Sequence, residues 1–188
     1  MLNLAPRHRH AGVSMVEVLV VVAILIALMA TGLPSFMDWV QNTQIRTAAE
    51  GLAAGLQSAR AEAVRRNTPV QFMLLGEGGV GETGWEIRVR NTNELVQAMP
   101  AGEGSAKAQL STQPADARMV TFNGLGRVDL PPPVGRGNAD GSPILQQINI
   151  DNPSLTAAKS RDLRVTISDG GSIRMCDPAT SGTDTRAC

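Results

Sequence analysis

The chain has 188 residues, which is enough for one domain with an accessory segment and too few for two domains of ordinary size. Its 17 Lys and Arg side chains balance 17 Asp and Glu side chains, so the net charge indicates neither a nucleic-acid partner nor a strongly acidic one. Both histidines lie in the first ten residues and both cysteines in the last thirteen. A zinc cage or an imidazole-assisted nucleophile is hard to build from such a distribution, and we expect no enzyme activity, metal or cofactor.

Residues 13–33 form a long apolar segment whose one charged side chain is Glu17. As a helix rising about 1.5 Å per residue, the segment would extend roughly 30 Å, the thickness of the hydrocarbon core of a bilayer. Arg7 and Arg9 precede it without any acid, so the positive-inside rule predicts a cytoplasmic N-terminus and an exported remainder. We therefore expect one membrane span over residues 13–34.

Three interpretations compete for this span. It could be a secretory signal peptide cut after the small residues 30–32, a plain anchor, or a helix whose acid has a partner. A carboxylate inside an apolar run costs about 2.5–3.5 kcal/mol on insertion scales, and such a residue usually has a function. Glu17 therefore favours the third interpretation.

The start of the chain resembles a known type of leader. A short basic segment ends at Gly12, Ser14 and Glu17 follow, and about twenty apolar residues lead to Pro34, as in the class III leaders of type IV prepilins and type II secretion pseudopilins. The resemblance implies that a prepilin peptidase removes residues 1–12 by cutting between Gly12 and Val13, and that the new amine is methylated. Val13 stands where that family most often has Phe.

The same resemblance gives Glu17 a role. In a filament, a Glu at the fifth position of the mature chain faces the amine of an adjacent subunit, so that two costly buried charges compensate each other. Glu17 is then a docking residue for assembly. The resemblance also implies that the helix bends or unwinds around Gly32 and Pro34, where proline removes a backbone hydrogen bond.

Residues 35–66 show the three- and four-residue apolar spacing of an amphipathic helix. The helix is expected to end at residue 66, before Asn67 and Pro69. Gly51 and Gly55 form a small pair that would let a second backbone approach, but close packing of the domain's own sheet on the helix is the better interpretation. Together with the span, this helix is longer than a small domain can cover, which predicts a lollipop shape.

From residue 67 the apolar pattern changes to alternation, which predicts an exported β-rich domain over residues 67–188. The predicted fold class is α+β, with the long helix packed on an antiparallel sheet or two sheets. The expected strands are 70–75, 85–90, 94–99, 119–122, 126–130, 144–150, 163–167 and 172–175. The glycine-rich stretch 76–84 is expected to be a hairpin loop, and residues 101–117 a link.

Cys176 and Cys188 would lie outside the membrane, where an even pair is most simply a disulfide. Closing a loop of this size stabilises a domain by about 3 kcal/mol in the chain-entropy model. Arg164, Arg174 and Arg186 could form a basic patch for DNA, although acidic residues are interleaved with them.

Residues 120–128 and 171–188 resemble the GspH/FimT family of minor pilins and pseudopilins, in particular its FimU-like and FimT-like members. FimT-like members implicated in DNA uptake carry a Gly-Arg-x-Arg motif near the C-terminus. Residues 171–174 read Gly-Ser-Ile-Arg here, so Ser172 replaces the first arginine and DNA is not the favoured partner.

This resemblance implies a minor type IV pilin that primes or caps the pilus by packing its helix against other minor pilins and the major pilin. The prepilin peptidase, which is also the N-methyltransferase, and the inner membrane are the other expected partners. The expected location is a single-pass protein of the inner membrane with a periplasmic domain, and later the pilus or pseudopilus. The alternatives are a type II secretion pseudopilin and a DNA-binding minor pilin for natural transformation.

Overall fold

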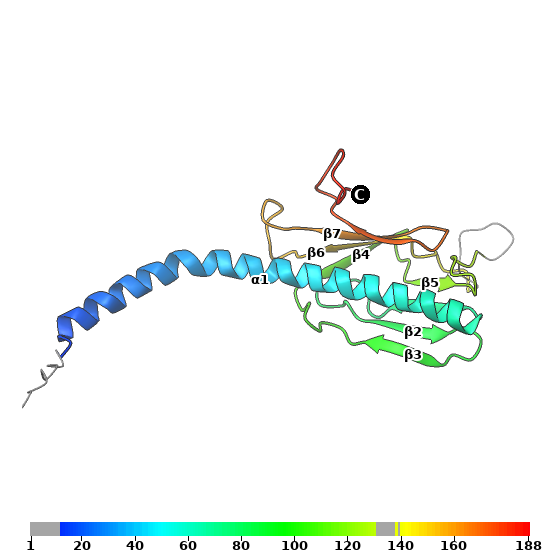
Figure 1. Ribbon diagram of the computed structural model, residues 1–188, viewed down its shortest axis with the longest axis horizontal. Helices are drawn as coiled ribbons and strands as arrows, with labels where there is room; N and C mark the ends of the chain where they lie inside the picture. The colour runs from blue at the N-terminus through cyan, green and yellow to red at the C-terminus, as the bar shows by residue number, and fades with distance from the viewer. Residues whose placement is uncertain (1–11, 131–137, 139) are drawn as a thin grey trace, which may run out of the picture. The chain divides into compact units, whose positions relative to one another are not determined.

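The computed structural model describes residues 12–130, 138 and 140–188 (Figure 1). The leader residues 1–11, with Arg7 and Arg9, lie outside the described residues. The chain separates into two compact units, Met1–Met37 and Asp38–Cys188. One helix, α1 (Met15–Arg66), contains both the expected apolar segment and the expected amphipathic segment.

Helix α1 ends where the sequence predicts. The backbone of Asn67 has a positive φ of 49°, a conformation that asparagine tolerates at the end of a helix. The N–H of Thr68 donates to the carbonyl of Ala63 (3.3 Å), and the N–H of Asn67 donates to the carbonyl of Val64 (3.3 Å). This is a Schellman motif, which satisfies two of the last carbonyls and turns the chain toward the first strand.

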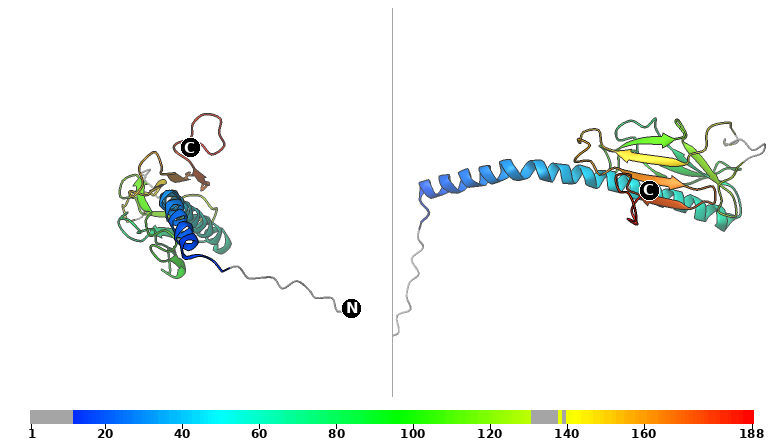
Figure 2. Two further views of the ribbon diagram at one scale, coloured as in Figure 1. Left: turned by 90° about the vertical axis from the view of Figure 1, so that its left-hand side faces the viewer. Right: turned by 90° about the horizontal axis from the view of Figure 1, so that it is seen from above.

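Eight strands form two antiparallel sheets in the unit Asp38–Cys188 (Figure 1). The first sheet has the order β3-β2-β1-β5 and the second the order β4-β6-β7-β8. Figure 2 shows the strands beside the second half of α1. The strands are β1 (Val70–Leu74), β2 (Trp85–Val89), β3 (Leu95–Met99), β4 (Gln109–Gln113), β5 (Met119–Phe122), β6 (Gln147–Asp151), β7 (Leu163–Ile167) and β8 (Ile173–Cys176).

One face of α1 and the inner faces of both sheets form the hydrophobic core. A Cβ atom added at Gly55 would lie 2.8 Å from the indole ring of Trp85 and 3.0 Å from Phe72, so only glycine fits under this aromatic pair. At Gly51 it would lie 3.3 Å from the sulfur of Met99. Packing of the domain's own sheet on the helix, the preferred interpretation of the two glycines, is therefore confirmed.

Three strand predictions differ from the structure. Residues 109–113 were expected in a link and form β4, an edge strand in which only Leu110 is buried. Residues 126–130 were expected as a strand and contain only an isolated bridge between Val128 and Phe122. Asn123 explains the difference, since its side-chain oxygen accepts the N–H groups of Leu125 and Arg127 and folds the segment into a turn.

The predicted strand 144–150 begins later than expected. Ile144 makes an isolated parallel bridge with Met119, and β6 starts at Gln147. The N–H of Leu145 donates to the carbonyl of Met119, and the N–H of Gln146 donates to that of Gln113, so this stretch pairs with two segments in turn instead of extending one ladder. The loop 76–84 does join β1 and β2 as a hairpin.

Candidate assembly site

The first half of α1 presents an apolar surface. None of the described residues 13–33 is buried. An 18-residue window of α1 has a mean hydropathy of 2.7, so the helix is long and apolar enough to cross a membrane. Leu19, Ile26 and Leu28 each expose 63% of their surface. Exposed apolar area of this extent requires lipid or other apolar helices as a partner.

A cap that the Ser14 hydroxyl forms on the backbone N–H of Glu17 starts this helix. The hydroxyl oxygen of Ser14 accepts the N–H of Glu17 (3.2 Å), and the N–H of Val18 donates to the carbonyl of Ser14 (3.2 Å). The spacing Ser-x-x-Glu is that of a capping box, and an acid in the first turn also complements the helix dipole. Sequence reasoning used these residues only as a leader motif, although the spacing also signals a helix start.

The proposed cleavage point precedes the helix. Gly12 and Val13 are exposed and lie outside α1, and a Cβ at Gly12 would meet no described atom within 4 Å. Gly32 and Pro34 lie inside α1, and a Cβ at Gly32 would likewise meet no described atom within 4 Å. The bend expected at Gly32 and Pro34 stays a prediction.

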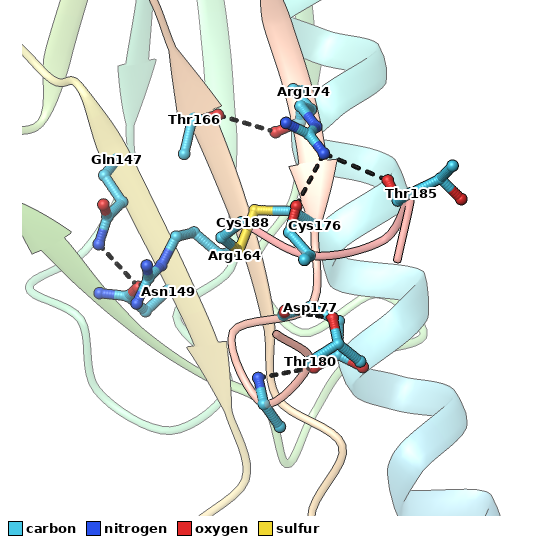
Figure 3. The surroundings of a disulfide bond; sticks show 12 residues. Gln147, Asn149, Arg164, Thr166, Arg174, Cys176, Asp177, Thr180, Thr185 and Cys188 are labelled. Carbon is cyan, nitrogen blue, oxygen red and sulfur yellow. Dashed lines mark hydrogen bonds between the residues drawn. A yellow bond between two sulfur atoms is a disulfide. The ribbon is translucent and has the colours of Figure 1, made fainter. Parts of the chain in front are cut away.

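The C-terminal loop is fastened to β8 at several points (Figure 3). A disulfide joins Cys176, the last residue of β8, to Cys188, with the two Cα atoms 5.1 Å apart. The guanidinium of Arg174 donates to the carbonyls of Thr185 (3.2 Å) and Ala187 (2.7 Å). Asp177 and Ala187 also form a parallel bridge, so the loop is held by covalent and polar contacts together.

The three arginines considered for DNA have partners within the domain. Arg174 bonds to the C-terminal loop, as described above, and the Nε of Arg164 donates to the side-chain oxygen of Asn149 (2.8 Å). Arg186 pairs with Asp184 at 2.8 Å, which lowers the pKa of this carboxyl to about 2 through the side-chain hydrogen bond. Arg164 and Arg174 share one face of the β7–β8 pair, whereas Arg186 lies on the loop.

A contact that sequence reasoning missed joins α1 to the connection between β6 and β7. The side chain of Asn42 donates to the carbonyl of Lys159 (3.0 Å) and accepts the N–H of Arg161 (2.8 Å). Lys159 also pairs with Asp38 at 2.7 Å. More than one hundred residues separate these partners in the chain, so no local pattern could have indicated the contact.

Within the described residues, no group of three or more His, Cys, Asp or Glu side chains could hold a metal ion. The acidic and basic side chains near the C-terminal loop are instead bonded to one another or to backbone groups. The described residues thus present two separate features, the exposed apolar first half of α1 and the C-terminal loop that is held on β8.

Comparison with known proteins gives one family and one fold. Residues 48–186, well over half of the chain, match the family described as type II transport protein GspH. Two crystal forms of the type IV minor pilin FimU of Pseudomonas aeruginosa are structurally similar, at 19% and 20% identity and TM-scores of 0.52 and 0.49. They cover 77% and 73% of this chain and 97% of FimU. No curated protein matches the sequence.

The similarity to FimU at a TM-score of 0.52 shows a pilin-like α+β fold, with a long N-terminal helix packed against antiparallel sheets. Proteins of this family are structural and not enzymes, and they assemble with other pilins. The apolar first half of α1 is consistent with a prepilin anchored in the inner membrane. The chain belongs to the GspH family and is a minor pilin or pseudopilin of the type IV pilus and type II secretion class.

Proposed function

We propose that the protein is a minor type IV pilin that primes or caps the pilus by packing α1 against other minor pilins and the major pilin. The observation that carries the proposal is the exposed apolar half of α1 with Glu17 in its first turn. A chain that leaves this surface uncovered needs the membrane before assembly and neighbouring helices after it.

In the proposed maturation, the prepilin peptidase cuts between Gly12 and Val13. The exposure of both residues and their position outside the helix support access by the enzyme. The cut removes the leader and keeps the apolar helix, and the new amine can then be methylated. Mass spectrometry of the mature N-terminus tests this step, and a mature chain that starts after residue 30 would exclude it.

Glu17 is proposed to dock on the amine of an adjacent subunit through its charge. Its position in the first turn, after the Ser14 cap, raises a second explanation, that Glu17 matters only because it helps to start the helix. Three variants separate the two explanations. Glu17→Ala removes the whole side chain and keeps the backbone N–H that Ser14 caps, Glu17→Gln keeps a side chain of the same size without charge, and Ser14→Ala removes the cap and keeps the charge.

We expect Glu17→Ala and Glu17→Gln to insert and to be cut, yet to be absent from sheared filaments. Ser14→Ala is expected to enter filaments at near wild-type level, because one exposed cap is worth only about 1 kcal/mol. Quantitative immunoblots of sheared filaments against membrane fractions give the measurement. Normal incorporation of Glu17→Gln would refute docking by charge.

A type II secretion pseudopilin is the second candidate, and the description of the matched family favours it. The C-terminal pair Cys176 and Cys188 favours the pilus, because the secretion pseudopilin commonly lacks such a pair. Deletion of the gene separates the two functions. Loss of twitching and surface pili with normal secretion supports the pilus, and the reverse result supports secretion.

DNA uptake is the weakest of the candidate functions, because Arg164, Arg174 and Arg186 each bond within the domain. Non-specific DNA binding needs several cations that can meet phosphates. A gel-shift assay with the purified protein is expected to show weak retardation that Arg174→Ala does not change. Tight, salt-sensitive binding that Arg174→Ala abolishes would instead establish a DNA receptor.

A further inference from the structure

The connection between β6 and β7, which we call the strap (residues 152–162), is fastened to α1 (Figure 1). The side-chain amide of Asn152, which is fully buried, donates to the side-chain oxygen of Gln41 (3.2 Å). Near the other end of the strap, the side chain of Asn42 donates to the carbonyl of Lys159 (3.0 Å). Both ends of the strap are therefore held on one turn of the helix.

The strap also forms one wall of a groove in the domain. The groove has a volume of about 840 Å³. The other walls come from α1, from β7 and from the C-terminal loop, and they include Trp39, Leu163 and Arg186. The position of the strap on α1 therefore determines how wide this groove is.

Two carboxyl groups meet at the base of the strap. The strands β6 and β7 are antiparallel neighbours, and their ladder ends at the pair of Ile150 with Leu163. The next position along the same register places Asp151 opposite Asp162. Like charges in directly opposed positions of two strands repel each other. The chain thus has an acid where the strap leaves the sheet and a second acid where the strap returns.

A single hydroxyl group lies between the two acids. The Oγ of Ser160 is 2.5 Å from the Oδ1 of Asp162 and 3.1 Å from the Oδ1 of Asp151. A serine hydroxyl has one hydrogen to donate, so it cannot make a full hydrogen bond to both carboxylates when both are ionised. A proton on one of the acids supplies the missing hydrogen. The closed arrangement of these three side chains therefore favours one proton on the acid pair.

The surroundings favour Asp162 as the acid that carries this proton. Burial raises the pKa of Asp162, and the neighbouring acids Asp151 and Asp177 act in the same direction. Asp151 is exposed, and its Oδ1 also accepts the N–H of Asn152. Exposure and a backbone donor both favour the charged form of a carboxyl, so Asp151 is the acid that ionises first.

The charged groups on the other elements around the strap have partners of their own. On α1, Asp38 pairs with Lys159 of the strap at 2.7 Å, and the neighbouring strap contacts are made by neutral amides. On β7, the Nε of Arg164 donates to the side-chain oxygen of Asn149 (2.8 Å). Arg161, the other cation of the strap, lines the groove.

We propose that Asp151, Ser160 and Asp162 form a carboxyl latch that closes the strap on α1 in acid and loosens it near neutral pH. A proton held within the closed latch binds the closed strap more tightly than the open one, so acid favours the closed state by linkage. The closed strap is most stable below the ordinary carboxyl value of 3.8 and loses stability as the pH rises through the raised pKa of Asp162. This device goes beyond the proposed function and does not depend on it.

Hydrogen exchange at Arg161 reports the state of the strap, because the N–H of this residue donates to the side-chain oxygen of Asn42 (2.8 Å). The full-length protein is studied in detergent micelles from about pH 4 to about pH 8, a range that covers a raised carboxyl pKa. Each measured rate is divided by the rate of an unstructured chain at the same pH. We expect the protection of the Arg161 N–H to fall about tenfold as the pH rises, while the amides of β1 keep theirs.

Three variants show whether the acid pair causes this change. Asp162→Asn supplies hydrogens without a titrating proton, so the Arg161 N–H should stay protected over the whole range. Asp151→Asn changes the same contact from β6 and should give the same flat response. Asp169→Asn is the matched control, because Asp169 is an exposed acid between β7 and β8 and should leave the wild-type response unchanged.

Several outcomes would overturn the latch. Protection of the Arg161 N–H that does not change with pH, or that changes equally in the wild type and in Asp162→Asn, excludes it. An equal loss of protection in β1 would show that the whole domain loosens, which also excludes a local device. These results leave the pilin function intact, since that function is tested by filament incorporation.

A measurement on the wild type alone decides the question if the Asn variants fail to fold. NMR titration of the aspartate carboxyl carbons follows the acid pair directly. One shared titration of Asp151 and Asp162 that extends above the ordinary value supports the latch. Two independent titrations near 3.8 would refute it.

Discussion

The two halves of α1 are both helical and rich in apolar residues, but they bury different amounts of surface. None of the described residues 13–33 is buried, whereas residues such as Ile45, Leu52 and Leu56 in the second half expose 1% or less. Backbone hydrogen bonding is the same in both halves, so it cannot explain the difference. The second half concentrates its apolar side chains on one face and packs on the sheets. The first half is apolar on all sides and needs lipid or the helices of other subunits around it.

The same substitution in the two halves gives the strongest test of this comparison. Leu56→Asp places a charge in the core at a residue with 0% exposure, and we expect loss of more than about 4 kcal/mol and an unfolded domain. Leu25→Asp changes a residue that is 47% exposed, and we expect the domain to fold normally while membrane insertion weakens. Protease resistance and fractionation measure the two effects, and equal protease sensitivity would contradict the comparison.

The C-terminal loop resembles the first half of α1 in burying no residue over 177–188, but it is held covalently. Replacing Cys176 and Cys188 by serine should lower the unfolding free energy by about 3 kcal/mol in the chain-entropy model. Arg174→Met removes only the hydrogen bonds to two exposed carbonyls and should cost about 1 kcal/mol. Denaturant unfolding with and without reductant measures both values, and a larger loss for Arg174→Met would reverse this ranking.

Three glycines of α1 test the same contrast between its two halves. Alanine at Gly55 must displace the rings of Trp85 and Phe72, and overpacking of this kind costs about 1–3 kcal/mol. Gly51→Ala meets only the flexible end of Met99, so the higher helix propensity of alanine should make it neutral or stabilising. Gly32→Ala should leave thermal unfolding of the domain unchanged. A midpoint for Gly55→Ala equal to that of Gly51→Ala would show that the aromatic pair can move.

The smallest expected effects concern two carboxyl groups of the domain whose pKa values are shifted in opposite directions. Burial raises the pKa of Asp162 above its ordinary 3.8, and the neighbouring Asp151 adds to the increase. The side-chain hydrogen bonds from Arg65 and then Arg66 lower the pKa of Glu62 from 4.5 to about 2. The charged form is thus disfavoured in the folded state at Asp162 and favoured at Glu62.

The sign of the pH dependence follows from these directions. Because its pKa is raised, ionised Asp162 lowers the unfolding free energy at neutral pH. That stability is regained as the pH falls from the raised pKa of the folded protein to the ordinary value of 3.8. Asp162→Asn should therefore raise the melting temperature at neutral pH. Glu62→Gln should lower it, and its effect should vanish as the pH falls from 4.5 to about 2. Calorimetry from neutral pH to about pH 2 detects both effects, and curves that stay parallel to that of the wild type would refute the assignment.

Local patterns predicted much of the fold. The end of α1 and most strands follow from periodicity, glycine and proline positions, and the pair of Gly51 and Gly55 was assigned to the domain's own packing. The strand β4 could not be found in this way, because Gln109–Gln113 is polar and buries only Leu110. The apolar residues in 126–130 suggested a strand, but the side chain of Asn123 stabilises a turn.

The surfaces of the candidate site were predictable to different degrees. Glu17 and the cysteine pair stand out in the sequence, because a lone acid in an apolar run and an even pair of cysteines are rare signals. The groove lined by Trp39, Leu163 and Arg186 does not, since these residues meet only after the chain has formed both sheets. Long-range contacts such as that of Asn42 with Arg161 determine this surface, and no spacing rule describes them.

The hydroxyl of Ser14, which accepts the N–H of Glu17, also limits where the chain can be processed. A cut after Gly12 leaves Ser14 in place and puts four residues, about one helical turn, between the new amine and the acid. Trimming of two more residues by another protease would remove the hydroxyl and leave the N–H of Glu17 without its side-chain acceptor. Ragged ends would therefore weaken the first turn by the roughly 1 kcal/mol of one exposed cap, so a uniform terminus would keep the start of the helix the same in every copy.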